Sequence, residues 1–487
     1  MGCPAHIQDQ TYRPREPDKT ALYQAVAGHL ETFLEECRQD GRNLPAHVKG
    51  ELLRFLSCGI YARGFSRWVC EKCGAEKVVA SSCKGRGFCP SCIGRRMNET
   101  AALLVDYVLP PVPVRQWVLT LPIELRYRLA YDGKLCSDVL AVFLRAVAGW
   151  YRRRARDMGH PDGRTGAVTV IQRANSDLRL APHFHSILLD GVYFGDGVGE
   201  PPLFVETPPP TDEEIKRLVE VIARRVIRLL VRRGVLDETV DAPDRFSEEE
   251  PVLAGLMQAS VMGTAATGER AGRRIRRVLS DPTPGQRTGD LCFASRGFSL
   301  HAARRVRPDQ ENKLEELCRY VLRPPLANNR LKWLGEDELL LALKRKWEDG
   351  TTHILLSKSE LLGRLAALVP PKGFNLTRYH GCLAPRSSLR DLIIPASEAP
   401  DEPALSEERT QVATTRPRRI PWAELLRRVF RSEVDRCDCG GRLKLVAFVT
   451  DPAEARRYLD YVGLPSEVPE IAPARAPPQP ELAFELS

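Results

Sequence analysis

Apolar residues between about residues 20 and 62 recur every three or four positions, with charged residues between them. This spacing places the apolar side chains on one face of a helix. The two sets are Leu22, Val26, Leu30, Phe33 and Leu34, and then Val48, Leu52, Leu53 and Leu56. We therefore predict two amphipathic helices within an N-terminal helical region that spans residues 1–62.

A different pattern begins near residue 110, where short apolar, β-branched runs alternate with helical stretches. The runs cover residues 116–120, 167–171 and 184–189. They predict a central sheet with helices packed on it, and so an α+β fold with a core over residues 110–335. Residues 205–307 are rich in Asp, Glu, Pro and Arg and contain one clear helix, residues 212–233. We read this segment as a helical insertion.

Prolines and polar residues set the remaining boundaries. A helix that runs through Tyr320 must end before Pro324 and Pro325, because proline lacks a backbone donor and clashes with the preceding turn. Residues 336–390 are assigned to an accessory DNA-binding region. Residues 391–420 have linker composition, and a small C-terminal domain over 421–464 and a disordered tail over 465–487 follow.

The cysteine spacing is the most specific local signal. Cys70 and Cys73 form one C-x-x-C pair, and after fifteen intervening residues Cys89 and Cys92 form a second pair. This pattern predicts one structural zinc ion bound by the four thiolates, in a zinc-ribbon-like domain over residues 63–105. Two further thiols, Cys58 and Cys83, could replace one of the four or join a second site. A site at Cys437 and Cys439 is not expected, because only one residue separates them.

Charge adds a candidate partner. The 487 residues carry 72 Lys and Arg against 63 Asp and Glu, a formal net charge of +9, and arginines occur in runs. Runs of this kind suit phosphate contacts, although solvated helix faces explain any single run about as well. The basic residues among the cysteines predict a nucleic-acid surface; they are Lys84, Arg86, Arg95 and Arg96. A signal peptide or membrane span is not indicated, so we expect a cytoplasmic protein with reduced thiols.

The segment Pro182-His183-Phe184-His185 provides a candidate catalytic metal site. Side chains alternate along a strand, so both imidazoles project from one face and Phe184 from the other. Such a pair can hold a divalent ion with open positions for a phosphate oxygen. Gln172, at the end of the preceding apolar run, is the candidate third ligand. Two ordinary core or surface histidines on a strand are the alternative reading.

Tyr320 is the candidate nucleophile. Arg319 and Arg323 lie at neighbouring helical positions and could cradle a DNA phosphate. A phenol is mostly protonated at neutral pH, so it would need precise alignment and stabilisation of the developing charge. A buried helix tyrosine is the alternative reading.

These pieces, in this order, resemble the rolling-circle transposases of the insertion-sequence ninety-one family, which belong to the His-hydrophobic-His (HUH) endonucleases. The matching blocks are CEKCGAEKVVASSCKGRGFCPSCIGRRM, VPVRQWVLTLPIELRY, VIQRANSDLRLAPHFHSILLDGVY, RYVLRPPLANNRL, FNLTRYHGCLAPRSSLR and RVFRSEVDRCDCGGRLKLVAF.

The resemblance implies an antiparallel sheet flanked by helices, with the histidines on a central strand and the tyrosine on a later helix. It implies that Tyr320 attacks single-stranded DNA and forms a 5′-phosphotyrosine, with magnesium or manganese held by His183, His185 and Gln172. Structural zinc would be bound separately. Further DNA contacts are assigned to Arg330, His380 and Arg386.

Some members of the family carry two tyrosines four residues apart, but Glu316 and Pro324 occupy those positions here. We therefore expect a one-tyrosine enzyme that acts near the bacterial nucleoid, with self-association left open. A plasmid replication initiator or relaxase with the same chemistry is one alternative, and a non-catalytic zinc-dependent DNA-binding regulator is another. If Tyr320 is not the nucleophile, Tyr379 is the next candidate.

Overall fold

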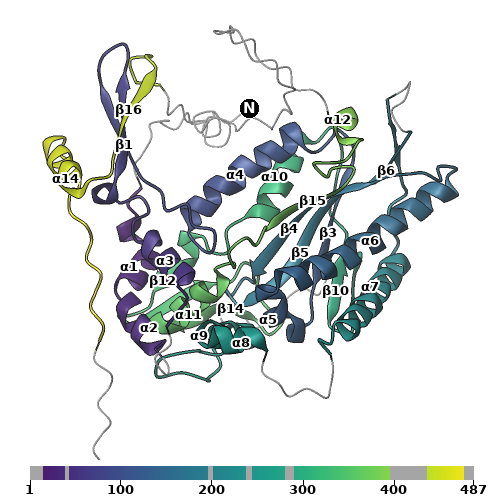
Figure 1. Cartoon of the computed structure of the whole chain (residues 1–487), viewed down its shortest axis with the longest axis horizontal. Coiled ribbons are helices and arrows are strands. Elements are labelled where there is room, and N and C mark those ends of the chain that lie inside the picture. Colours follow the sequence, from purple (N-terminus) through teal and green to yellow (C-terminus); the bar gives the residue numbers. More distant parts are fainter. Residues whose placement is uncertain are drawn as a thin grey trace, which may run out of the picture.

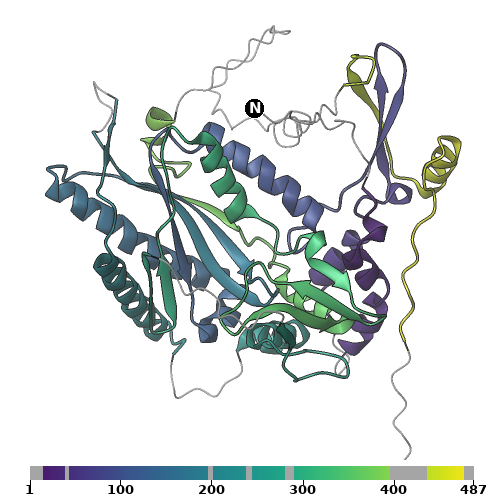
Figure 2. The same cartoon turned by 180° about the vertical axis from the view of Figure 1, so that it is seen from behind.

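The computed structural model describes residues 15–38, 43–195, 201–236, 244–279, 290–394 and 436–475. Helices pack on both faces of one large antiparallel sheet, and two smaller units lie beside it (Figures 1 and 2). This arrangement confirms the α+β class. Within the described ranges, no helix is long and apolar enough to span a membrane.

The large sheet has the strand order β15–β4–β5–β3–β10–β9, and β11 also pairs with β3. All of these pairings are antiparallel. The bounds are β3 Val114–Thr120, β4 Gly166–Ala174, β5 Leu180–Leu189, β9 Cys292–Ser295, β10 Phe298–His301, β11 Arg305–Val306 and β15 Thr377–Gly381. The three predicted strands are therefore confirmed as β3, β4 and β5, and β5 lies between the other two.

Two helical layers cover the two faces of this sheet. Phe184 of β5 packs with the layer that includes α6 and α7, whereas Ile187 and Leu189 pack with α4 and α10. Figure 1 shows α6 and α7 in front of the sheet, and Figure 2 brings α4 and α10 forward. The helices are α4 Pro90–Tyr107, α5 Ile123–Tyr131, α6 Gly133–Asp157, α7 Asp212–Arg232, α10 Glu311–Leu322 and α12 Arg390–Ile393.

The segment 205–307 is not only a helical insertion. Its helix α7 packs on the sheet through Ile215, Val219 and Ile222. Strands β10 and β9 of the same segment extend the large sheet beyond β3. The expectation was wrong because strands of only four residues leave little periodicity to recognise. A short two-stranded ribbon, β6 Gly191–Phe194 with β7 Leu203–Glu206, leads into this segment.

The N-terminal helices pack against a second, four-stranded sheet with the order β12–β13–β14–β8. The first predicted helix is divided at Gly28 and His29, so the region has three α-helices rather than two. The helices of this unit are α1 Ala21–Ala27, α2 Leu30–Glu36, α3 Ala46–Phe55, α8 Arg245–Glu249, α9 Pro251–Met262 and α11 Lys358–Leu368. The strands are β8 Arg276–Leu279, β12 Leu331–Trp333, β13 Glu338–Ala342 and β14 Thr351–Ser357, and the 3-10 turns are Pro17–Lys19, Tyr61–Arg63 and Asn328–Arg330.

The C-terminal segment joins the N-terminal ribbon instead of forming a domain of its own. Strand β16 (Leu443–Val449) pairs with β1 (Phe65–Cys70), which pairs with β2 (Glu76–Ala80). Helix α14 (Pro452–Tyr461) packs on the ribbon through Leu459 and Phe65. In the stretch expected to be a disordered tail, Ala472 donates its backbone N–H to the carbonyl of Ala27 at 2.9 Å. The rest of that tail (476–487) and most of the expected linker lie outside the described residues.

A buried ion pair ties β3 to the end of β5. Arg115 binds both carboxylate oxygens of Asp190 at 2.9 Å, and their side chains are 3% and 1% exposed. The hydroxyl of Tyr151 in α6 donates to the same carboxylate at 2.8 Å, and Arg305 of β11 donates to it at 2.8 Å. The carboxylate of Asp190 is thus held by side chains from β3, α6 and β11.

We expect Asp190→Ala to lower the free energy of unfolding by about 3–5 kcal/mol, because it leaves the buried guanidinium of Arg115 without a counter-charge. Urea unfolding followed by circular dichroism measures the change. Glu206→Gln is the control, since Glu206 pairs with Arg305 at the surface and its loss should cost less than about 1 kcal/mol. Equal effects of the two substitutions would contradict a central role for the buried pair.

Candidate active site and cysteine clusters

The histidine pair and Tyr320 lie together on one face of the large sheet. The ring centroids of His183 and His185 are 5.0 Å apart, and those of His185 and Tyr320 are 5.9 Å apart with the rings nearly perpendicular. Phe184 is fully buried on the opposite face, as strand alternation predicts. The three candidate groups therefore meet around one point, between β5 and α10.

Their surroundings keep both imidazoles uncharged. Burial, followed by the nearby guanidinium of Arg323, lowers the pKa of His183 to about 4, although the hydrogen bond to Ala181 opposes this. Burial, followed by His183, lowers the pKa of His185 well below its usual value. Neutral imidazoles have the free lone pair that a metal ion requires. Within the described residues, no other His, Cys, Asp or Glu completes a three-ligand group with them.

Hydrogen bonds orient the two rings. His183 Nδ1 lies 2.7 Å from the carbonyl oxygen of Ala181, so this nitrogen carries the proton and Nε2 is left as the acceptor. The side-chain Nε2 of Gln116 in β3 lies 2.8 Å from His185 Nδ1 and donates to it in this arrangement. A 180° rotation of the amide places its oxygen there instead, and His185 Nε2 is then free as an acceptor. Gln116 was missed from the sequence because nothing local links it to a residue 69 positions away.

Gln172 lies opposite His183 in the β4–β5 register, but its amide nitrogen is engaged elsewhere. It donates to the carbonyl of Val321 at 2.6 Å and to that of Tyr320 at 3.4 Å. In a continuing helix these carbonyls would accept from residues 324 and 325, which are prolines and have no N–H. Gln172 thus supplies the missing donor and holds the end of α10 beside the histidines.

Cationic side chains surround the tyrosine ring. The guanidinium of Arg323 lies 4.2 Å from the ring centroid of Tyr320, and that of Arg304 lies 5.5 Å away. Lys344 belongs to the same region: burial, then Arg323 and Arg330, lower its pKa to about 7. Arg304 and Lys344 were not among the candidates, because neither lies in a recognisable motif. Together these groups suit a phosphate in front of the tyrosine.

The four predicted zinc ligands do not form one site. The cysteines divide into two clusters, and in each cluster the four sulfurs lie within 4.8 Å of one another. Cys89 and Cys92 join Cys58 and Cys83, whereas Cys70 and Cys73 join Cys437 and Cys439. The prediction was wrong because the pairing of β1 with β16 places Cys70 and Cys73 next to Cys437 and Cys439 instead.

The first cluster, Cys58, Cys83, Cys89 and Cys92, fits a tetrahedral ion. Its sulfur–sulfur distances include 3.6 Å for Cys58 and Cys92, 3.4 Å for Cys83 and Cys92, and 3.7 Å for Cys58 and Cys89. Four sulfurs about 2.3 Å from a zinc ion lie about 3.8 Å from one another. Cys89 precedes α4 and Cys92 lies in its first turn, so the cluster anchors the start of the helix that packs beside α10.

Two family models match the chain in the order of these sites. A transposase zinc-binding domain matches residues 28–121, and a putative transposase model matches residues 166–390. The chain belongs to the transposases of the insertion-sequence ninety-one family. The first model contains the whole first cysteine cluster, and the second contains the histidines and Tyr320.

Curated relatives agree with this assignment. The transposase is 25% identical over 400 residues to the putative transposase y4qJ of Sinorhizobium fredii (strain NBRC 101917 / NGR234), which covers 79% of this chain and 87% of the relative. It is 23% identical over 339 residues to the transposase for insertion sequence element IS801 of Pseudomonas savastanoi pv. phaseolicola, which covers 68% and 69% of the two chains. No solved structure matches the transposase.

The predicted DNA-binding residues occupy varied positions in the transposase. Lys84, Arg95, Arg96 and Arg386 are exposed. Arg86 instead donates to the carbonyl of Phe374, and Arg330 donates to the carbonyls of Ala342, Pro325 and Ser176. Arg319 pairs with Glu315 at 2.5 Å. Burial, followed by Arg378, lowers the pKa of His380 to about 4, and the ring Nε2 has no partner.

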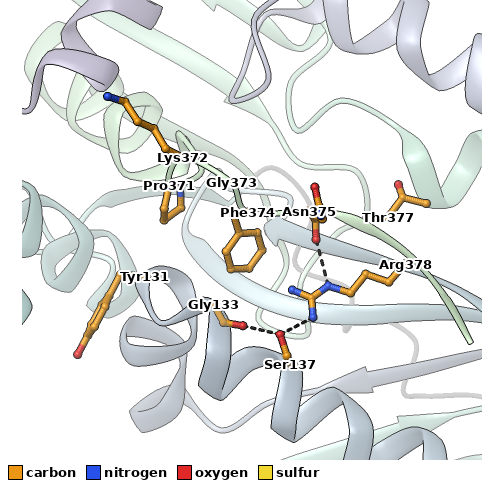
Figure 3. Close-up of a pocket in the computed structure, with 10 residues that line it drawn as sticks. All are labelled: Tyr131, Gly133, Ser137, Pro371, Lys372, Gly373, Phe374, Asn375, Thr377 and Arg378. Carbon is orange, nitrogen blue, oxygen red and sulfur yellow. Dashed lines mark hydrogen bonds between the residues drawn. The ribbon is translucent and has the colours of Figure 1, made fainter.

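A cavity of about 550 Å³ lies elsewhere in the transposase (Figure 3). Arg378 lines this cavity and donates to Ser137 of α6 at 2.5 Å and to the carbonyl of Asn375 at 3.2 Å. Because Ser137 belongs to α6 and Phe374 packs with that layer, the cavity is on the opposite face of the sheet from the histidines. It contributes no residue to the candidate active site.

We expect Cys58→Ser to remove about one equivalent of zinc from the purified transposase and to lower its melting temperature, because a closed cysteine site adds binding energy to folding. Atomic emission measures the metal, and scanning calorimetry measures the temperature. Cys37→Ser is the matched control, since Cys37 is also buried but belongs to neither cluster. Undiminished zinc in Cys58→Ser would show that the first cluster is assigned wrongly.

Proposed function

We propose that this transposase nicks single-stranded DNA at the ends of its element through Tyr320, and rejoins the strands in rolling-circle transposition. The single observation that carries the proposal is the meeting of His183, His185 and Tyr320 on one face of the sheet. The substrates would be the element ends and the target, on the nucleoid in the bacterial cytoplasm. Transposase function itself follows from the family.

The proposed step exchanges one ester bond for another. The Tyr320 oxygen attacks the phosphorus of a phosphodiester, and the bond from phosphorus to the 3′ oxygen breaks. The phenol loses its proton, and the departing 3′ oxygen gains one and leaves as a hydroxyl. The product is a 5′-phosphotyrosine, whose bond energy allows a 3′-hydroxyl to attack later and rejoin strands without ATP.

Each side chain of the site has a part in this step. The guanidinium groups of Arg323 and Arg304 would stabilise charge on the phosphate oxygens, since both already lie next to the Tyr320 ring. A magnesium or manganese ion, bound through Nε2 of His183 and His185, would supply Lewis-acid polarisation of the phosphate. The Oε1 atom of Gln172 is the proposed third ligand, while its amide nitrogen holds α10.

Helix α10 contains a single tyrosine, Tyr320, so one protomer can hold one covalent DNA end at a time. A second cleavage then requires release of Tyr320, a second protomer or another nucleophile. A plasmid replication initiator or relaxase would use the same chemistry, but the curated relatives are named transposases. A non-catalytic regulator would bind DNA without ever forming an adduct.

We expect the transposase, magnesium and a single-stranded element-end oligonucleotide to yield an adduct that survives denaturing electrophoresis, and Tyr320→Phe to abolish it. Tyr379→Phe is the matched control, because Tyr379 also packs in the α4–α10 layer but lies on the edge strand β15. His183→Ala with His185→Ala should remove the adduct while circular dichroism stays unchanged. An adduct that persists in Tyr320→Phe would transfer the nucleophile to another residue.

We expect Gln172→Glu to slow adduct formation about tenfold, because a carboxylate cannot donate to the carbonyls of Tyr320 and Val321 and repels them, at a cost of about 1–3 kcal/mol. The concentration of manganese that gives half-maximal rate should not rise, since a carboxylate oxygen is at least as good a ligand as an amide oxygen. Single-turnover rates against manganese concentration separate the two effects. A wild-type rate in Gln172→Glu would show that the hydrogen bonds from Gln172 do not hold α10 in its active position.

A further inference from the structure

The second cysteine cluster joins the two ends of the chain. Cys70 ends β1 and Cys73 lies in the turn before β2, whereas Cys437 and Cys439 lie in a turn before β16. The pairs Cys70–Cys439 and Cys73–Cys437 are separated by 369 and 364 residues. Cys437 and Cys439 lie outside both family-matched regions, which end at residues 121 and 390.

The sulfur positions suit a metal ion better than disulfides. Cys70 Sγ lies 3.5 Å from Cys439 Sγ, and Cys73 Sγ lies 3.5 Å from Cys437 Sγ. A disulfide requires about 2.05 Å between sulfurs. A tetrahedral zinc–thiolate site places them about 3.8 Å apart. All four sulfurs lie within 4.8 Å of one another, so a single ion can reach every one.

Two tight turns present these thiols. The N–H of Gly74 donates to the carbonyl of Cys70 at 3.0 Å, and the N–H of Gly440 donates to the carbonyl of Cys437 at 2.8 Å. Both glycines have positive φ, of 73° and 78°, which other residues adopt with strain. Each turn thus ends at a glycine with positive φ, and the turn is one residue longer in the C-x-x-C segment than in the C-x-C segment. The short spacing is no obstacle to ligation, because each turn needs to supply only two sulfurs.

The contact between the turns is close. A Cβ atom at Gly441 would lie 2.6 Å from Cys70 Sγ, so only glycine lets the second turn approach the first. The N–H of Glu71 donates to the carbonyl of Arg442 at 3.0 Å, and Lys72 Nζ donates to the carbonyl of Cys439 at 3.3 Å. The register of β1 and β16, from Phe65 with Val449 to Cys70 with Leu443, continues directly from this contact.

We propose that Cys70, Cys73, Cys437 and Cys439 bind a second structural zinc ion, which clamps the C-terminal segment onto the N-terminal zinc-binding domain. The β-ribbon alone offers a small core, formed by Tyr61, Phe65, Ala455 and Leu459. A closed thiolate site adds the binding energy that so small a core lacks. Cys73 and Cys439 are exposed, whereas the first cluster is largely buried, so a chelator reaches the second ion first.

Metal content tests the site. The reduced, full-length transposase should contain two equivalents of zinc, and the double variant Cys437→Ser/Cys439→Ser should contain one. Cys292→Ser is the control and should keep two, because Cys292 lies outside both clusters. A wild-type value of one, or a double variant that keeps two, would overturn the second site. The free thiols of the denatured protein are also counted in the absence of reductant. A pair of disulfides would lower this count by four and would leave no thiolates to bind the metal.

Retention of the C-terminal segment tests the clamp. A protease recognition sequence placed between residues 395 and 435 of the full-length protein allows cleavage of the chain without removal of either part. After cleavage, the C-terminal fragment should co-elute with the rest in gel filtration, and should dissociate after mild EDTA treatment or in the double variant. A fragment that stays bound without the second ion would show that β-pairing holds it and would overturn the clamp. Neither measurement depends on DNA cleavage by Tyr320.

Discussion

The register of β5 between β3 and β4 is the constraint on which the rest of the active site depends. Both faces of this strand are covered by helices, so every residue is committed to one layer. A shift of one residue would turn Phe184 toward α10 and the two imidazoles into the apolar layer of α6. The bidentate pair of Arg115 with Asp190 closes the end of the same strand pair and resists such a shift.

The position of Tyr320 follows from contacts that lead back to the cysteines. The first cluster fixes the start of α4, α4 packs beside α10, and Gln172 receives the end of α10 where Pro324 and Pro325 leave two carbonyls without donors. Helix α4 therefore belongs both to the zinc-binding domain and to the layer that contains Tyr320. A change in the position of α4 at the cysteines would shift α10, and with it Tyr320, through the contact between the two helices.

Much of the fold could be predicted because its signals are local. The runs that became β3, β4 and β5 lie within residues 114–189, and their alternation correctly placed His183 and His185 on one face. The prolines after Tyr320 correctly ended α10 at Leu322. What could not be predicted depends on distant partners. C-x-x-C pairs fifteen residues apart look like one site, and nothing near Cys70 indicates a partner at residue 439. Gln172 was found by its position in the hairpin, but its hydrogen bonds to α10 require the tertiary structure.

The three-stranded sheet of β16, β1 and β2 takes its third strand from residues 443–449, whereas β1 and β2 precede the whole catalytic region. During synthesis, one edge of β1 therefore stays unpaired until the whole catalytic region has been made, and unpaired strand edges invite aggregation and proteolysis. A frameshift after the codon for residue 394 would leave every residue of the candidate active site encoded and still yield a protein with that edge open. The N-terminal zinc-binding domain thus depends for one strand pairing on a segment that contributes no residue to the candidate active site.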